Sequence, residues 1–341
     1  MRKVAVVTTG FFDGVHLGHR HVLETVVSAA RERGEEAVVV TFWPHPRTVL
    51  QQDARDFRLL SSLEEKKALL TACGISRVDV IPFTKEFAAM KADEYLQLLH
   101  NRYGASLVVM GYDNRIGSDG LTCAQLSEEG YSSQTVGSAD PSRQFALRAH
   151  SGPSLLCCRG WHRFERNTPL SDPAPTGCSD ERDYPAPTCH SERSEESHIS
   201  STAIRKALTA GEVERANEML GYRYNLYGVV VAGNRMGRTI GFPTANMQLY
   251  EPLKLVPADG VYAVDVEVQG RYFKGMCNIG MRPTVDGKAR TIETHILDFN
   301  EDIYGLPLRI HFVRRIRDER KFPSLEALRE QLQLDALNCK K

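Results

Sequence analysis

The chain has 341 residues, 42% of them hydrophobic and 25% charged, and its 43 basic and 43 acidic residues give a formal net charge of zero. These proportions are ordinary for a globular protein with room for two domains, and the neutral charge gives no reason to expect a nucleic acid or a membrane surface as partner. The apolar run at residues 4–7 is too short for a signal sequence or a membrane span, and no later stretch is more suitable.

Eight cysteines are spread along the chain. Cys73, Cys123, Cys277 and Cys339 stand alone, and the other four lie between residues 157 and 189. In a chain of this size, such a distribution indicates free thiols rather than a disulfide framework. The sequence therefore predicts a protein of the reducing cytoplasm.

The first motif joins a predicted strand at residues 4–7 to a predicted helix that begins near residue 17. His16 and His19 are three residues apart at the start of this helix, so both can face the same side. A helix start offers unpaired N–H groups and the positive end of the helix dipole, which together favour a phosphate. With Arg20, the two imidazoles could stabilise the charge that grows on a triphosphate under attack. The alternative is that one histidine only caps the helix and the other is solvated.

The elements that follow alternate between strands and helices. Strands are predicted over residues 36–42, 78–81 and 107–110, and helices after the capping box at 61–65 and over 92–103. This alternation predicts an α/β fold with a doubly wound parallel sheet. The His16 turn and the loops at 43–47 and 111–115 all follow strand ends, so we expect them to share one crevice.

The pattern changes after residue 117. Residues 118–150 show no strand or helix of the required length, and residues 151–197 are rich in Pro, Ser, Glu, Arg and Cys. A segment of this second kind cannot bury enough apolar surface to offset its ordering entropy, so it is predicted to be a disordered insertion. Cys178, Cys189, His190 and His198 could be offered as a zinc site, but they lack a C-x-x-C pair, and an inert tether is favoured.

Order is expected to resume at residue 199. Ser and Thr side chains at 200–202 are typical of a helix start, and Arg205 would project from the first turn, where a polyphosphate could meet it. A second short helix is predicted to end at Gly221. We therefore predict two domains, at residues 1–220 and 221–341, with the insertion inside the first.

The second half has short strands separated by Gly, Asp and Pro turns. They are predicted over residues 227–232, 260–268, 271–277, 291–297 and 308–314, with a closing helix over 324–332. Antiparallel strands of this length and spacing are typical of a barrel with Greek-key character.

A glycine-rich segment at 233–246 interrupts these strands and ends in Pro243-Thr244-Ala245-Asn246. Its glycines let the backbone approach a phosphate closely, and Thr244 and Asn246 supply hard oxygen ligands of the kind that Mg²⁺ takes. Glu293 stands on a strand that is otherwise apolar or β-branched, so it could act as the base for a hydroxyl. An outward-facing Glu with no chemical role is an equally good interpretation of the spacing alone.

Six motifs together resemble the bacterial bifunctional riboflavin kinase/FAD synthetase family. They are F-D-G-V-H-L-G-H-R at 12–20, P-H-P-R at 44–47, G-Y-D-N-R at 111–115, S-S-T-A-I-R at 200–205, G-R-T-I-G-F-P-T-A-N at 237–246 and E-T-H at 293–295. The resemblance covers roughly residues 1–117 and 199–338. It implies a doubly wound α/β nucleotidyltransferase domain of the H-x-G-H type, followed by a six-stranded-type antiparallel β-barrel kinase domain with a C-terminal helix.

The resemblance also implies two reactions, with Mg²⁺ as cofactor and riboflavin, FMN and ATP as partners. In the barrel, Glu293 would be the base that lets riboflavin attack ATP, with Mg²⁺–ATP held by Thr244 and Asn246. In the first domain, His16 and His19 would stabilise the α-phosphoryl transition state as FMN attacks a second ATP. Arg205, Ser201 and Thr202 would hold the leaving pyrophosphate, and Gly111, Tyr112 and Asp113 would line the adenosine pocket. Further ATP contacts are implied at Gly10, Phe12, Asp13, Gly14, Gly18, Gly233, Gly237, Arg238, Gly241 and Pro243.

Residues 118–199 depart from the strand–helix–strand that the family resemblance implies there. If the last strand were missing, the chain would be a riboflavin kinase with an impaired adenylyltransferase. The sequence is also compatible with a nucleotidyltransferase that uses another phosphate acceptor, its barrel serving only binding, and with a flavin carrier without catalysis. The joint presence of the two histidines, Arg205, Thr244, Asn246 and Glu293 argues against a mere carrier.

Overall fold

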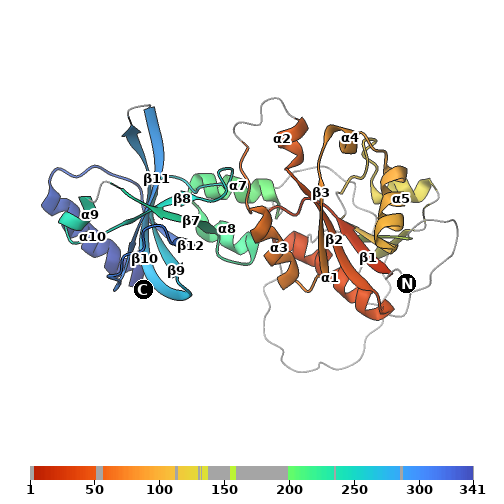
Figure 1. Ribbon diagram of the computed structural model, residues 1–341, viewed down its shortest axis with the longest axis horizontal. Coiled ribbons are helices and arrows are strands. Elements are labelled where there is room, and N and C mark those ends of the chain that lie inside the picture. Colours follow the sequence, from red (N-terminus) through yellow and green to blue (C-terminus); the bar gives the residue numbers. More distant parts are fainter. Residues whose placement is uncertain are drawn as a thin grey trace, which may run out of the picture. The chain divides into compact units, whose positions relative to one another are not determined.

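Six parallel strands form the sheet of the first half, in the order β3-β2-β1-β4-β6-β5. The computed structural model describes residues 4–50, 57–111, 114–129, 131, 133–136, 154–158, 199–233, 236–284 and 287–340. The strands are β1 (Ala5–Thr9), β2 (Glu36–Trp43), β3 (Arg77–Pro82), β4 (Ala105–Gly111), β5 (Ser133–Val136) and β6 (Ser154–Cys158) (Figure 1). The predicted parallel α/β sheet is confirmed.

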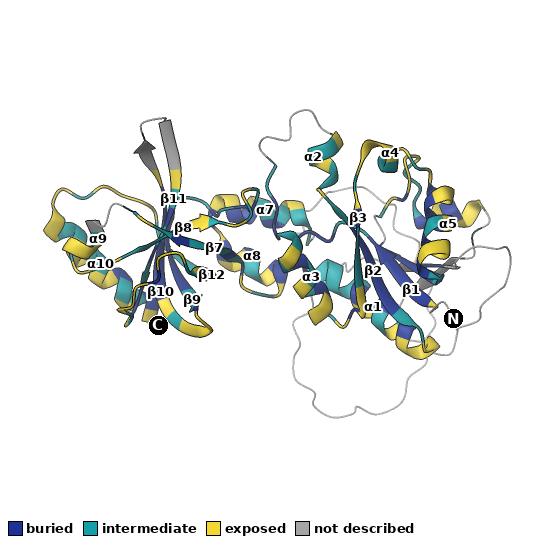
Figure 2. Ribbon diagram, in the orientation of Figure 1, coloured by how far each residue is buried: buried dark blue, intermediate teal, exposed yellow. Residues whose placement is uncertain are grey.

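Helices cover both faces of this sheet. Alternate residues of each strand point to opposite faces, so each face packs against its own helices. Val7 and Val40 pack with Leu96 of α5, whereas Val6 and Val39 pack with Leu23 of α1. The helices of this half are α1 (Leu17–Arg33), α2 (Pro46–Leu50), α3 (Leu63–Ala72), α4 (Lys85–Ala88), α5 (Ala92–Tyr103), α6 (Cys123–Glu128), α7 (Ser201–Ala210) and α8 (Val213–Leu220). Figure 2 shows β1 and β2 as largely buried.

Two helix predictions are confirmed in detail. The α5 helix has the predicted bounds and ends at Gly104, whose left-handed backbone closes the last turn. The α3 helix begins with the predicted capping box, in which Ser62 and Glu65 satisfy one another's backbone N–H groups. The start of α3 is therefore firmly fixed.

The expectation that residues 118–150 hold no strand or helix is wrong, because α6 and β5 lie there. The predicted insertion at 151–197 also begins too early, because β6 lies inside it and pairs with both β4 and β5. Leu155 and Leu156 of β6 are buried, as expected for a short apolar strand inside a parallel sheet. The polar composition around that short run concealed it. Residues 159–198, including Cys178, Cys189, His190 and His198, lie outside the described residues.

Deleting residues 151–197 is therefore expected to damage the first half rather than leave it intact. The deletion removes β6, and burying its two leucines contributes on the order of 3–6 kcal/mol, a large share of a typical domain stability. Both tryptophans, Trp43 and Trp161, precede residue 199, so tryptophan fluorescence follows only this half during unfolding. The deletion removes Trp161 and leaves Trp43 of β2 as the probe. An unchanged fluorescence transition in the deleted protein would show that β6 is dispensable.

The second half is a closed antiparallel barrel with the strand order β10-β11-β8-β7-β12-β9. Its elements are β7 (Asn225–Val231), α9 (Met236–Thr239), β8 (Ala245–Leu249), β9 (Gly260–Val268), β10 (Arg271–Thr284), β11 (Gly287–Ile296), β12 (Pro307–Arg317) and α10 (Leu325–Lys340). The predicted barrel is confirmed, and β8 is the strand that closes it. The sequence interpretation assigned Ala245 and Asn246 to a phosphate loop and so missed β8.

Two further findings concern the predicted closing helix and the predicted domain boundary. The closing helix α10 continues to Lys340, past the predicted residue 332, where buried Asp335 pairs with Arg317 at 2.8 Å. Helices α7 and α8 pack into the same apolar cluster as the barrel, through Leu208 and Leu220 among others. The boundary at residue 220 stays a prediction. No helix among the described residues has the length and apolar character needed to span a membrane.

Candidate active sites

The turn between β1 and α1 has an unusual backbone. Phe12 and Val15 have positive φ angles of 51° and 38°, a conformation that costs about 1–3 kcal/mol for residues other than glycine. Gly14 has φ of 79°, and a Cβ there would lie 3.0 Å from the Leu60 side chain, so the close packing requires glycine. This turn delivers His16 to the start of α1, where strained backbone is typical of a functional site.

His16 and His19 are brought together as predicted. The backbone N–H of His19 donates to Nδ1 of His16 at 3.4 Å, so His16 caps α1. The two rings stack with 3.7 Å between their centroids, and a Cβ on Gly18 would lie 3.3 Å from the His16 ring. The expectation that one of the two histidines caps the helix is therefore confirmed for His16. A solvated side chain does not fit His19, because its Nδ1 is buried and has no hydrogen-bond partner among the described residues.

Both histidines are neutral at pH 7. Burial, aided by the positive charge of Arg205, lowers the pKa of His16 to about 4. Burial, His16 and Lys66 lower the pKa of His19. Neutral imidazoles still donate hydrogen bonds through N–H, and an anionic substrate would favour their protonation.

The lowered pKa of His16 makes the first half less stable in mild acid. Between pH 6.5 and about 4 the unfolded chain binds a proton that folded His16 does not, so stability falls as pH decreases through this window, by up to about 3 kcal/mol. Tryptophan-monitored urea unfolding at pH 7.5 and 5 measures the effect. His16→Asn, which keeps a capping side chain, should show a shallower pH dependence, and an equal dependence would contradict the assignment.

A buried ion pair ties α7 to this turn. The carboxylate of Asp13 accepts hydrogen bonds from the backbone N–H groups of Leu60 and Ser61, each at 3.0 Å, and pairs with the Arg205 guanidinium. The Ser201 hydroxyl donates to the backbone carbonyl of Asp13 at 3.1 Å. The structure thus brings Ser201 and Arg205 to the His16 turn, as the motifs implied. Asp13 orients Arg205, a role that its local sequence did not reveal.

The remaining predicted loops also meet at the carboxyl ends of these strands. The ring centroids of His45 and Phe11 lie 3.9 Å apart. The Asn114 side-chain amide donates to the Thr9 carbonyl at 3.4 Å. Gly10 directly follows β1 and Gly111 ends β4 at this edge, and Thr202 is exposed in the first turn of α7. Tyr112 and Asp113 lie outside the described residues. The expectation that the three loops share one region is supported wherever the structure describes them.

The second site is built on β8 and β11 of the barrel. The Thr244 hydroxyl donates to the Glu293 carboxylate at 3.3 Å, and Asn246 lies directly opposite Glu293 in the strand pairing. Nδ1 of His295 lies 2.7 Å from the Pro243 carbonyl, which fixes the segment that leads into β8. The predicted base and the two predicted metal ligands are therefore neighbours.

These residues fit a magnesium ion that is also held by phosphates. Thr244 and Asn246 offer a hydroxyl and an amide oxygen, which are hard ligands. A Cβ on Gly233 would lie 2.1 Å from the Asn246 amide, so the missing side chain makes the space that this ligand occupies. No cluster of three His, Cys, Asp or Glu residues that could bind a metal occurs in the described part. Mg²⁺ keeps several waters and binds substrate phosphate oxygens, so it needs few ligands from the protein.

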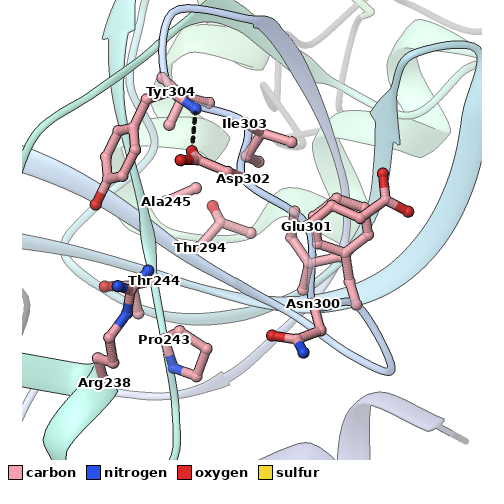
Figure 3. Close-up of a pocket in the computed structure, with 13 residues that line it drawn as sticks. Arg238, Pro243, Thr244, Ala245, Thr294, Asn300, Glu301, Asp302, Ile303 and Tyr304 are labelled. Carbon is pink, nitrogen blue, oxygen red and sulfur yellow. Dashed lines mark hydrogen bonds between the residues drawn. The ribbon is translucent and has the colours of Figure 1, made fainter.

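A cavity of about 450 Å³ opens beside these residues (Figure 3). Arg238, Pro243 and Thr244 line one side. The family resemblance implied ATP contacts for the first two and a metal ligand for Thr244. Two glycines in the segment that leads to Thr244 cannot be replaced without strain. A Cβ on Gly237 would lie 2.2 Å from the Phe242 carbonyl oxygen, and Gly241 has φ of 85°. The remaining lining residues are Val230, Ala245, Thr294, Ile296, Phe299, Asn300, Glu301, Asp302, Ile303 and Tyr304.

The loop at 299–304 was not predicted from sequence. In Figure 3 it borders the cavity opposite Arg238 and Pro243, and Asp302 accepts a hydrogen bond from the Tyr304 backbone N–H at 3.1 Å. Two acids and two aromatic side chains in six residues were the available signal, but nothing in the local sequence places them near residue 244.

Comparisons with known proteins find relatives for both halves of the chain. A family model for FAD synthetase matches residues 1–141, and one for riboflavin kinase matches residues 220–341. The bifunctional riboflavin kinase/FMN adenylyltransferase of Listeria monocytogenes is 34% identical over 335 residues, which cover 97% of this chain and 90% of the relative. The Bacillus subtilis protein of the same description is 32% identical over 334 residues, with the same coverage.

One solved structure is similar over the whole chain. The crystal structure of a macrolide-efflux protein from Streptococcus pneumoniae has a TM-score of 0.79 and 30% sequence identity, and the match covers 100% of this chain and 95% of that one. Both family models and the full-length curated relatives lead to one conclusion. The chain belongs to the family of bifunctional riboflavin kinase/FMN adenylyltransferases.

Proposed function

We propose that this enzyme makes FMN from riboflavin in residues 221–341 and FAD from FMN in residues 1–220, each step using one ATP. The observation that carries the proposal is that each set of motif residues, scattered in sequence, converges in the structure. His16, Asp13 and Arg205 meet at one site, and Thr244 and Glu293 meet at the other. A cytoplasmic location is part of the proposal, supported by the thiols of Cys73, Cys277 and Cys339, which form no disulfide.

In the first step, Glu293 accepts the proton of the riboflavin 5′-hydroxyl as that oxygen attacks the γ-phosphorus of ATP. The new oxygen–phosphorus bond forms as the bond to the β-phosphate oxygen breaks, and ADP leaves with the electron pair. The hydrogen bond from Thr244 orients the carboxylate beside the cavity. Thr244 and Asn246 would hold Mg²⁺, which when bound neutralises charge on the phosphates.

In the second step, an FMN phosphate oxygen attacks the α-phosphorus of ATP, and pyrophosphate leaves with the electrons of the broken bond. No proton need move and no covalent enzyme intermediate is required. His16 and His19 donate hydrogen bonds to the α-phosphoryl oxygens as charge grows on them. Arg205, Ser201 and Thr202 hold the pyrophosphate, with Arg205 oriented by Asp13 and by the Arg58 carbonyl, which accepts from Nε at 2.8 Å.

Asp13→Asn tests this arrangement. The variant keeps the shape of the side chain but removes the charge that orients Arg205, and we expect FAD formation to fall by about 10²-fold. FMN formation from riboflavin in the same sample serves as the control and should be unchanged. FAD formation within a few fold of the unmodified enzyme would show that the ion pair does not organise the pyrophosphate site.

A further inference from the structure

Lys66 is a buried lysine that the two proposed reactions do not use. It lies in the second turn of α3, where its backbone N–H donates to the Ser62 carbonyl at 2.9 Å, and its side chain has no exposed surface. Its ammonium lies 3.4 Å from the centre of the Phe11 ring and 5.9 Å from that of Trp43. The side chain therefore reaches the ends of β1 and β2, where a parallel sheet of this kind binds its ligands.

The ammonium has three N–H donors and no hydrogen-bond partner among the residues that the structure describes. Burial lowers the pKa of Lys66 to about 8, while the charge of Asp13 acts in the opposite direction, so the side chain is mostly protonated at pH 7. Asp13 is itself engaged by Arg205 and two backbone N–H groups. A buried charge without hydrogen bonds is costly, and an aromatic ring face compensates for it only partly.

Lys66 is one of several cations near the His16 turn, where Asp13 is the anion that acts on it. Burial lowers the pKa of His45, and the positive charges of Arg205, Lys66 and Arg47 lower it further. Lys66 also contributes to the lowered pKa of His19, after burial and His16. Three cations thus act on one histidine beside the His16 turn. The missing partner of the ammonium is therefore an anion, and it would lie next to the groups that we assign to adenylyl transfer.

We propose that Lys66 is a further substrate-binding residue of the adenylyl-transfer site, and that its ammonium donates to a phosphate oxygen of FMN or of ATP. This inference rests on the proposed function of that site. Both substrates present the same chemistry, a phosphate oxygen, and kinetics with each substrate varied in turn distinguish them.

Lys66→Met in the full-length enzyme is the test, with Lys67→Met as the matched control. Met preserves most of the side-chain volume and removes the charge, whereas Lys67 is 39% exposed and pairs with Glu64 on the surface. With FMN and Mg²⁺–ATP as substrates, we expect kcat/KM for FAD formation to fall by about 10²-fold in Lys66→Met. Lys67→Met should retain it, and both variants should form FMN from riboflavin normally.

The kinetic constants identify the ligand. A raised KM for FMN alone assigns the contact to the FMN phosphate, and a raised KM for ATP alone assigns it to the ATP phosphates. A lowered kcat with both KM values unchanged assigns the contact to the transition state. Weaker inhibition by added inorganic pyrophosphate would accompany a contact to ATP. Each of these results supports the proposal, and unchanged FAD kinetics would overturn it.

A purely structural role predicts a different result. If Lys66 only stabilises the Phe11 ring, its loss lowers both the tryptophan-monitored stability and FAD formation. Replacing an uncompensated buried charge by Met should instead leave the stability unchanged or raised. If Lys66→Met does not fold, Lys66→Gln replaces it, because Gln keeps a hydrogen-bond donor without the charge. The same changes in FAD kinetics and stability are then expected. Failure of both variants to fold would refute the proposal. Absence of FAD formation in the unmodified enzyme would contradict the proposed function itself.

Discussion

Glu293→Gln is expected to abolish FMN formation from riboflavin while leaving the conversion of added FMN to FAD intact. The amide cannot accept the proton of the attacking hydroxyl, and loss of a general base lowers kcat by about 10²–10⁴-fold. Its oxygen can still accept the hydrogen bond that Thr244 donates to the carboxylate, so the packing around β8 and β11 is preserved. Riboflavin, FMN and FAD separated by chromatography give both rates from one sample.

Glu267→Gln is the control for this experiment, because it removes a carboxylate from β9 of the same barrel, where Glu267 pairs with Arg309. It should form FMN at the normal rate. If Glu293→Gln forms FMN within about tenfold of the unmodified enzyme, Glu293 is not the base. A nucleotidyltransferase whose barrel only binds its ligand predicts instead that neither the unmodified enzyme nor the variant forms FMN.

The second large effect is expected at His16 and His19. Replacing either with Ala removes a hydrogen-bond donor to the α-phosphoryl group, and each loss should lower the rate of FAD formation by about 10²–10³-fold. FMN formation should be unaffected, because the kinase residues belong to the barrel. The measurement is FAD formation from added FMN and Mg²⁺–ATP.

His16 requires a sharper variant, because it also caps α1 and a lost cap costs about 0.5–2 kcal/mol. His16→Asn keeps a capping side chain and removes the imidazole, so its folding should be close to that of the unmodified enzyme. If His16→Asn forms FAD at the normal rate, the contribution of His16 is only structural and its catalytic assignment is wrong.

Local sequence signals predicted the elements that local interactions specify. The turn before His16, the capping box of α3 and the Gly104 end of α5 depend on residues within one or two helical turns, and all three are in the structure. The barrel was predictable as a class because its strands are separated by clear turn residues. Four of the six strands of the first half, and the placement of His16, could thus be inferred without coordinates.

Several features depend on contacts that local patterns do not encode. Asp13 and Arg205 are separated by 192 residues, so no spacing rule identifies them as a pair. Strand β6 is flanked by polar sequence and β8 follows a glycine-rich segment, so each is recognisable only from its neighbours in the sheet. Lys66 looked like any helical lysine beside Lys67, and only its burial against Phe11 sets it apart.

The most direct test of the central claim is a time course with the purified enzyme, riboflavin and Mg²⁺–ATP, in which chromatography separates riboflavin, FMN and FAD. Two working sites on one chain predict that FMN appears first and that FAD follows at its expense. FMN that accumulates without FAD would contradict an intact adenylyl-transfer site, despite the complete sheet. Folded protein that forms neither product would contradict the account as a whole.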